Sequence, residues 1–97
     1  MTTLKRTDEF DRWLKGLTDA IGKGKIVTRV QRMEAGNPGD VAPVGEGISE
    51  MRIHSGPGYR VYFKQQGETA TILYGGDKDT QQADIAKAKN ILSNLEE

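Results

Sequence analysis

The sequence has no cysteine and a single histidine, His54. Without thiols the chain has neither a disulfide framework nor a thiolate nucleophile, and one histidine argues against a zinc site. No apolar run approaches the ~18 residues that indicate a membrane span, and the N-terminus lacks the apolar core of a signal peptide. We therefore expect a cytoplasmic protein that uses no metal, no cofactor and no membrane.

The formal net charge is zero, because 14 Lys and Arg residues balance 14 Asp and Glu residues. The distribution is nevertheless uneven: residues 1–32 hold eight bases and four acids, whereas residues 33–97 hold six bases and ten acids. A nucleic-acid-binding surface would therefore be local. The length fits one domain spanning residues 1–97, with any active site on a sheet face or in a shallow groove.

A helical period dominates the first third of the chain. Residues 3–6 are a candidate strand, and Thr7 is a good N-cap for a helix whose apolar stripe is Phe10, Trp13, Leu14 and Leu17. A break between Gly16 and Gly24 precedes a second helix that runs to Met33. Residues 36–47 are rich in Gly and Pro, so we expect a loop there.

From Ile48 the period changes to two, which predicts strands over residues 48–54, 59–64 and 69–74. If the apolar residues of the first two strands share one core, Arg60 lies opposite Arg52 or His54. The opposite face then gathers Arg52, His54, Arg60, Tyr62 and Lys64, and we expect Arg60 to be exposed.

The last helix is predicted to begin at Asp79, with Gln82 in the capping-box position, after Gly75 and Gly76 end the third strand. Its buried stripe would be Ile85, Ala88, Leu92 and Leu95. The expected fold is α+β, in the order β-α-α-β-β-β-α. Two N-terminal helices and one C-terminal helix pack on a small twisted antiparallel sheet.

The predicted polar face suits a phosphodiester. Guanidinium groups bind phosphate and stabilise the charge that grows on its oxygens, and His54 is a candidate acid or base near neutral pH. Tyr62 or Tyr59 could stack on a base, and the 2′-hydroxyl of RNA supplies the nucleophile. The alternative is the ordinary solvated face of an antiparallel sheet.

The second helix carries a basic stripe that includes Lys25 and Arg29. We assign both residues to substrate binding, together with Lys64, Tyr59 and Tyr62. The alternative is a solvated helix face without a ligand.

Five strings, in this order, resemble one toxin family: FDRWL at 10–14, GNPGD at 36–40, VGEGISEMRI at 44–53, GPGYRVYF at 56–63 and LYGGDKDTQQADI at 73–85. Together they look like the addiction-module killer proteins, a HigB-like branch of the RelE/ParE toxin superfamily that also occurs in phages. The resemblance spans residues 4 to 95.

This resemblance implies the toxin of a type II toxin–antitoxin system with a RelE-like fold. Enzymatic members of the family cut mRNA on the translating ribosome without a metal. Arg60 matches the arginine associated with phosphate binding, Arg52 a basic position on the preceding strand, and Lys78 a second basic residue after the last strand. The implied partner is an antitoxin, often a helix-turn-helix protein, and the complex would bind operator DNA.

Two departures from the family keep other functions open. The chain is neutral whereas enzymatic members are strongly basic, and Gln81 and Gln82 follow Lys78 where a tyrosine or histidine is common. The alternatives are a non-enzymatic toxin of the kind that poisons DNA gyrase, and a phage-derived domain that is retained only to bind an antitoxin.

Overall fold

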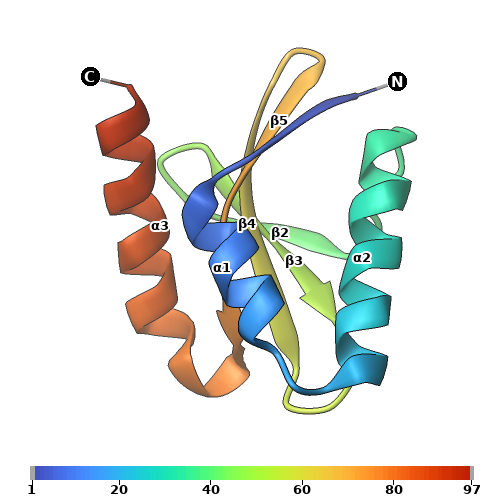
Figure 1. Ribbon diagram of the computed structural model, residues 1–97. Coiled ribbons are helices and arrows are strands. Elements are labelled where there is room, and N and C mark those ends of the chain that lie inside the picture. Colours follow the sequence, from blue (N-terminus) through green and yellow to red (C-terminus); the bar gives the residue numbers. More distant parts are fainter. Residues whose placement is uncertain (1, 97) are drawn as a thin grey trace.

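Five strands form one sheet in the order β1-β5-β4-β3-β2 (Figure 1). The computed structural model describes residues 2–96. Along the chain the elements are β1 (Thr3–Arg6), α1 (Asp8–Gly16), α2 (Ala20–Glu34), β2 (Val41–Gly45), β3 (Ile48–Ile53), β4 (Tyr59–Gln66), β5 (Thr69–Asp77), the 3-10 turn η1 (Lys78–Thr80) and α3 (Gln81–Leu95).

This architecture is α+β, but the predicted order β-α-α-β-β-β-α and the antiparallel sheet are wrong. The order is β-α-α-β-β-β-β-α, because β2 forms within the segment that was expected to be a loop. Pro43 and a register shift between Pro43 and Gly45 hide this strand, and both are tolerated because β2 is an edge strand. The sheet is mixed, since β1 pairs in parallel with β5.

Helix starts follow local capping. The Thr7 side chain accepts a hydrogen bond from the Phe10 amide, which confirms the predicted start of α1. The side chain of Asp19 does the same for the Gly22 amide, so α2 begins earlier than expected and Gly22 and Gly24 lie inside it. The predicted break is therefore only residues 17–19.

The end of β5 differs from the prediction because Gly75 and Gly76 continue the strand instead of ending it. A Cβ at Gly75 would collide with the ring of Trp13, and one at Gly76 with the carboxylate of Asp84. Asp77 and Thr80 then form a capping box around η1, which delays the start of α3 from Asp79 to Gln81.

The sheet lies between two helical layers. Phe10 of α1 and Ile26, Val30 and Met33 of α2 pack on one face, in a core completed by alternate residues of β3, β4 and β5. On the other face, α3 packs Ala88, Ile91 and Leu92 against Ile48, Tyr62 and Leu73. Leu95, predicted to be buried, is 56% exposed.

None of the helices within residues 2–96 has both the length and the apolar character needed to cross a bilayer.

Candidate functional site

The β3–β4 hairpin has the parity that the sequence predicts. Five residues, 54–58, connect the paired residues Ile53 and Tyr59, and this odd number keeps the apolar residues of both strands on one side. Arg52 is paired with Arg60 across the two strands. The two arginines are therefore neighbours on the face that α3 covers.

A buried carboxylate links these two arginines. The Glu50 side chain is only 4% exposed, and its Oε1 lies 3.1 Å from Arg52 Nε while its Oε2 lies 3.7 Å from Arg60 Nε. Gln81 at the start of α3 donates a hydrogen bond of 2.7 Å to Oε2. We call Glu50, Arg52, Arg60 and Gln81 the Glu50 cluster.

Arg60 is not exposed as predicted, because α3 lies over this face of the sheet. Its side chain is 12% exposed. Nη1 donates to the backbone carbonyls of Gly58, at 3.1 Å, and of Tyr59, at 3.2 Å. Nε is buried and has no hydrogen-bond partner among the described residues. Nη1 is thus engaged within the fold, and little of this guanidinium is accessible to a ligand.

Arg52 and Lys78 are the accessible cations beside Arg60. The Arg52 side chain is 39% exposed, and its Nη1 lies 3.8 Å from Asp40 Oδ1. Lys78 is exposed on η1, and no carboxylate in residues 2–96 lies within ion-pair distance of it. A Cβ at Gly58 would lie 3.4 Å from Lys78 Cβ and 3.5 Å from Arg60 Nη1. Lys78 and Arg60 therefore flank the hairpin turn.

His54 lies on the other side of Arg52. Its Nε2 is 2.7 Å from Asp40 Oδ2, and its side chain is 73% exposed. The hydrogen bond with His54 is the main cause of the lowered pKa of Asp40; burial opposes it, and the charge of Arg52 adds a smaller lowering. Asp40 thus joins His54 and Arg52 in a line of charged groups that continues into the Glu50 cluster.

The two tyrosines are not available for base stacking. Tyr62 is fully buried beneath α3, and burial raises its pKa well above the usual value. Tyr59 is 6% exposed, and its hydroxyl donates a 3.0 Å hydrogen bond to Asp19 in the opposite layer. Neither ring can stack on a base, because helices cover both faces of β4. The alternation of polar and apolar residues in β4 did not reveal that α3 lies over its second face.

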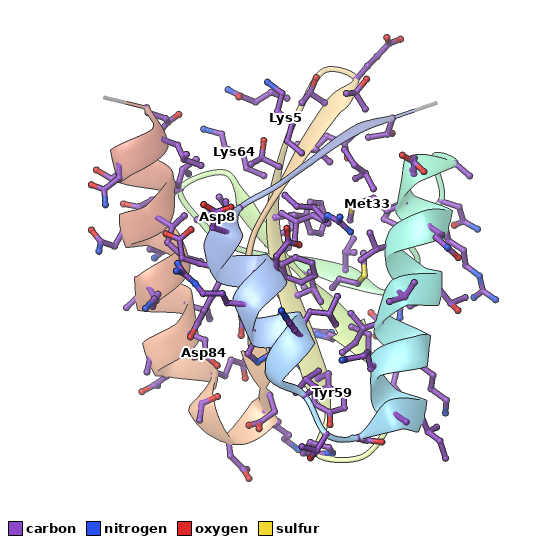
Figure 2. All side chains as sticks on the ribbon, viewed as in Figure 1. Lys5, Asp8, Met33, Tyr59, Lys64 and Asp84 are labelled. Carbon is purple, nitrogen blue, oxygen red and sulfur yellow. The ribbon has the colours of Figure 1, made fainter. Side chains whose placement is uncertain are left out.

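The remaining predicted substrate-binding residues are dispersed. Figure 2 shows Lys64 and Tyr59 toward opposite ends of the sheet, and Lys64 forms an ion pair of 3.1 Å with Glu96. Arg29 donates to the carbonyls of Arg52, at 2.6 Å, and Pro38, at 2.9 Å, so it fastens the segment before β2 to β3. Lys25 is exposed on α2.

Sequence reasoning missed the acidic part of the site. Glu50 was not recognised as the partner of both arginines, and Gln81 was noted only as a departure from the family. Asp84 lies partly buried beside Thr80, to which it is hydrogen bonded, and burial raises its pKa. Only the register, which pairs Glu50 with Tyr62, gives a signal for this cluster.

The arrangement can bind an anion at one edge of the hairpin, where Arg52 and Lys78 are accessible. Within residues 2–96, no three His, Asp or Glu side chains converge in a way that could hold a metal ion.

A relative from Haemophilus influenzae matches nearly the whole chain. It is 46% identical over 93 residues, which span 95% of this chain and 94% of that protein, and it is described as an uncharacterized protein. No protein-family model and no solved structure matches the chain. At this identity and coverage, the chain belongs to the same protein family as the Haemophilus influenzae protein.

Proposed function

We propose that the protein is the toxin of a type II toxin–antitoxin system and a metal-independent mRNA endoribonuclease. One observation supports the proposal most directly: Arg52 and Arg60 are paired across β3 and β4, and Lys78 borders the same turn. These are the three basic positions that the resemblance to HigB-like toxins of the RelE/ParE superfamily selects.

The proposed reaction uses RNA as its own nucleophile. The 2′-hydroxyl attacks the adjacent phosphorus, the bond to the 5′-oxygen breaks, and the products carry a 2′,3′-cyclic phosphate and a 5′-hydroxyl. Arg52 and Lys78 contact the phosphoryl oxygens from the open side, and Arg60 contributes Nη2 from beneath. His54, whose Nε2 is hydrogen bonded to Asp40, accepts the proton of the 2′-hydroxyl on Nδ1, and water protonates the leaving 5′-oxygen.

The proposal includes the cellular setting that the resemblance implies. The toxin works in the cytoplasm on mRNA that is bound to the ribosome. A cognate antitoxin, a helix-turn-helix protein, neutralises it, and the complex binds operator DNA. The ribosome compensates for the neutral charge of the chain, because it holds the RNA in place and only a local basic surface is needed.

A second candidate function is supported by the Glu50 cluster. Glu50 neutralises much of the charge of Arg52 and Arg60, and Asp77, Asp79 and Asp84 lie within a few residues of Lys78 in the sequence. This acidic setting disfavours phosphate binding and favours a toxin that acts by binding a protein such as DNA gyrase. The phage-derived domain without toxicity is the third possibility.

Induction of the chain alone, followed by mapping of mRNA 5′ ends, separates these functions. Cleavage supports the nuclease; growth arrest with intact transcripts and inhibited supercoiling by purified gyrase supports the second candidate. Normal growth with the antitoxin gene deleted contradicts both. Lys78→Ala and Arg52→Ala test the site better than Arg60→Ala, because their side chains are more exposed.

We expect each exposed-site variant to lower cleavage by roughly 100-fold, as loss of one charge-stabilising donor does in other enzymes. Lys5→Ala is the matched control, because Lys5 is also exposed but lies on β1, at the opposite side of the sheet from the β3–β4 hairpin turn. Equal cleavage by Lys78→Ala, Arg52→Ala and Lys5→Ala would contradict the assigned site.

A further inference from the structure

A groove runs along the outer side of α2, away from the Glu50 cluster. It has a volume of about 560 Å³ and is lined by residues of α2 and the end of β3, among them Ile21, Gly24, Lys25, Thr28, Arg32 and Ile53. We call it the α2 groove. The α2 residues are spaced by three or four, so they form one stripe that is roughly 16 Å long.

The lining of the α2 groove is more apolar than polar, although it faces solvent. Ile21 is 74% exposed, whereas Ile26, Val30 and Met33 on the inner side of the same helix are buried in the core. A single exposed isoleucine needs no explanation. Ile21 differs because it stands at a groove that Ile53, itself only 2% exposed, also lines, so an apolar side chain that enters there would contact Ile21 and the accessible edge of Ile53.

Gly24 has no role within the chain that requires glycine. A Cβ at Gly24 would meet nothing within 4 Å, whereas one at Gly22 would come within 2.4 Å of the Tyr59 ring. Glycine in the interior of a helix lowers stability relative to alanine. Gly22 is thus explained by close packing on Tyr59, and Gly24 leaves open space in the middle of the α2 groove.

The rim of the α2 groove is positively charged. Lys25 and Arg32 have no carboxylate within ion-pair distance among residues 2–96. Arg29 between them donates to backbone carbonyls and forms no ion pair within the described residues, although its charge contributes to the lowered pKa of Asp40. The groove therefore combines an apolar floor with unneutralised cations, which is complementary to an amphipathic segment that carries carboxylates.

Nucleic acid fits this surface less well than a peptide. No Phe, Tyr or Trp lines the groove, and the one ring there, the imidazole of His54, is hydrogen bonded through Nε2 to Asp40, so the groove has no large aromatic ring on which a base could stack. The floor is apolar, whereas a phosphate backbone needs polar partners. A helix in a groove uses both features, because it places apolar side chains on the floor and acids along the rim.

We propose that the α2 groove docks an acidic amphipathic helix of a partner protein. A large apolar side chain of this helix lies between Ile21 and Ile53, its carboxylates pair with Lys25 and Arg32, and its backbone approaches α2 over Gly24. This inference does not depend on RNA cleavage: of the side chains that the proposed reaction uses, only His54 also lines the groove.

The test uses a designed helical peptide of about four turns, with leucines spaced three and four apart and flanked by glutamates. NMR titration of the whole labelled chain should shift the amides along the stripe from Ile21 to Arg32. The same peptide with lysine in place of glutamate should not bind. An RNA oligonucleotide that binds the groove more tightly than the acidic peptide would overturn the proposal.

Two double variants with the same charge change separate the rim from general electrostatics. Lys25→Glu with Arg32→Glu should weaken peptide binding by roughly tenfold or more, whereas Lys5→Glu with Arg12→Glu, outside the groove, should have less than about a threefold effect. Equal weakening by both pairs would mean that the peptide senses only net charge, and would overturn the proposal.

Gly24→Ala gives a readout that separates docking from folding. The substitution should raise the melting temperature, because alanine favours the helix and meets nothing. It should also weaken peptide binding by roughly fivefold, because the methyl group occupies the space for close approach. A variant that is more stable and binds equally well would remove Gly24 from the proposed contact and contradict the stated geometry.

Discussion

The two faces of the sheet are built on different principles. Eleven buried residues form the core between the sheet and the α1/α2 layer, and all of them except Tyr59 have wholly apolar side chains. Only six form the core beneath α3, and beside them lie the charges of Glu50 and Arg60 and two buried polar atoms, Arg60 Nε and Tyr62 Oη, that have no hydrogen-bond partner among the described residues.

This difference separates the work of the two layers. Burial of apolar surface is the dominant favourable contribution to folding, so the α1/α2 face supplies most of the stability. Buried ion pairs are weak evidence for stability, because desolvation offsets their attraction. The charged groups on the α3 face are thus expected to contribute little net stability.

The largest expected effect is on the α1/α2 face. Phe10→Ala should lower the free energy of unfolding by about 3–5 kcal/mol, because Phe10 is fully buried and the neighbouring side chains cannot refill the space. Leu92→Ala, in the buried side of α3, should lower the free energy of unfolding by less, about 2–3 kcal/mol. Urea unfolding of both variants measures the difference, and a larger loss for Leu92→Ala would reverse the ranking of the two faces.

Removal of the buried carboxylate should come next. Glu50→Ala leaves Arg60 buried without a counter-charge, and we expect a loss of about 3 kcal/mol. The double variant Glu50→Leu with Arg60→Met should recover most of it, because both charges leave together. If the double variant is as unstable as the single one, the pair is a structural requirement and the contrast between the faces fails.

The two buried tyrosines offer a matched pair, one for each face. Tyr59→Phe should cost about 1 kcal/mol, because it removes the hydrogen bond to Asp19. Tyr62→Phe should be neutral or stabilising by up to about 1 kcal/mol, because its buried hydroxyl has no partner in the described structure. Chemical denaturation measures both, and a loss for Tyr62→Phe would mean that its hydroxyl is bonded in solution.

The smallest effects are pH-dependent and opposite in sign on the two faces. Burial raises the pKa of Asp84, so its contribution favours folding at low pH and is lost as the pH rises from 3.8 through the raised pKa. Hydrogen bonds from the Gly22 amide and the Tyr59 hydroxyl lower the pKa of Asp19. The contribution of Asp19 to stability is therefore present above pH 3.8 and is lost as the pH falls through the lowered pKa.

Asn substitutions at these two positions test the signs. At pH 7, Asp84→Asn should raise the urea midpoint and Asp19→Asn should lower it, and both differences should shrink toward pH 3. Shifts in the same direction for both variants would show that the environments of the two carboxyls are not opposed.

Local patterns were sufficient for most elements. Thr7 marked the start of α1, and strand parity paired Arg52 with Arg60, because capping and alternation are short-range properties. Pro43 and Gly45 hid the edge strand β2, because its pairing with β3, not its own propensity, makes it a strand.

The cover of the second sheet face was not predictable from alternation. Arg60, Tyr62 and Lys64 read as a solvent face, and nothing within β4 indicates that α3 lies over it. The periodicity of α3 gives its apolar side but not the sheet face that this side contacts. The exposure of Arg60 and the role of Tyr62 were therefore wrong, whereas their neighbourhood with Arg52 was right.

The parallel pair of β1 and β5 has a consequence for synthesis. Residues 3–6 of β1 pair with residues 69–72 of β5, so β1, which is synthesised first, can pair only after β5 has been synthesised. Such distant pairing slows folding, because a long loop must close before the contact forms. A chain interrupted before β5 leaves the first strand without its neighbour, so the sheet can close only after the segment through Asp77 has been synthesised.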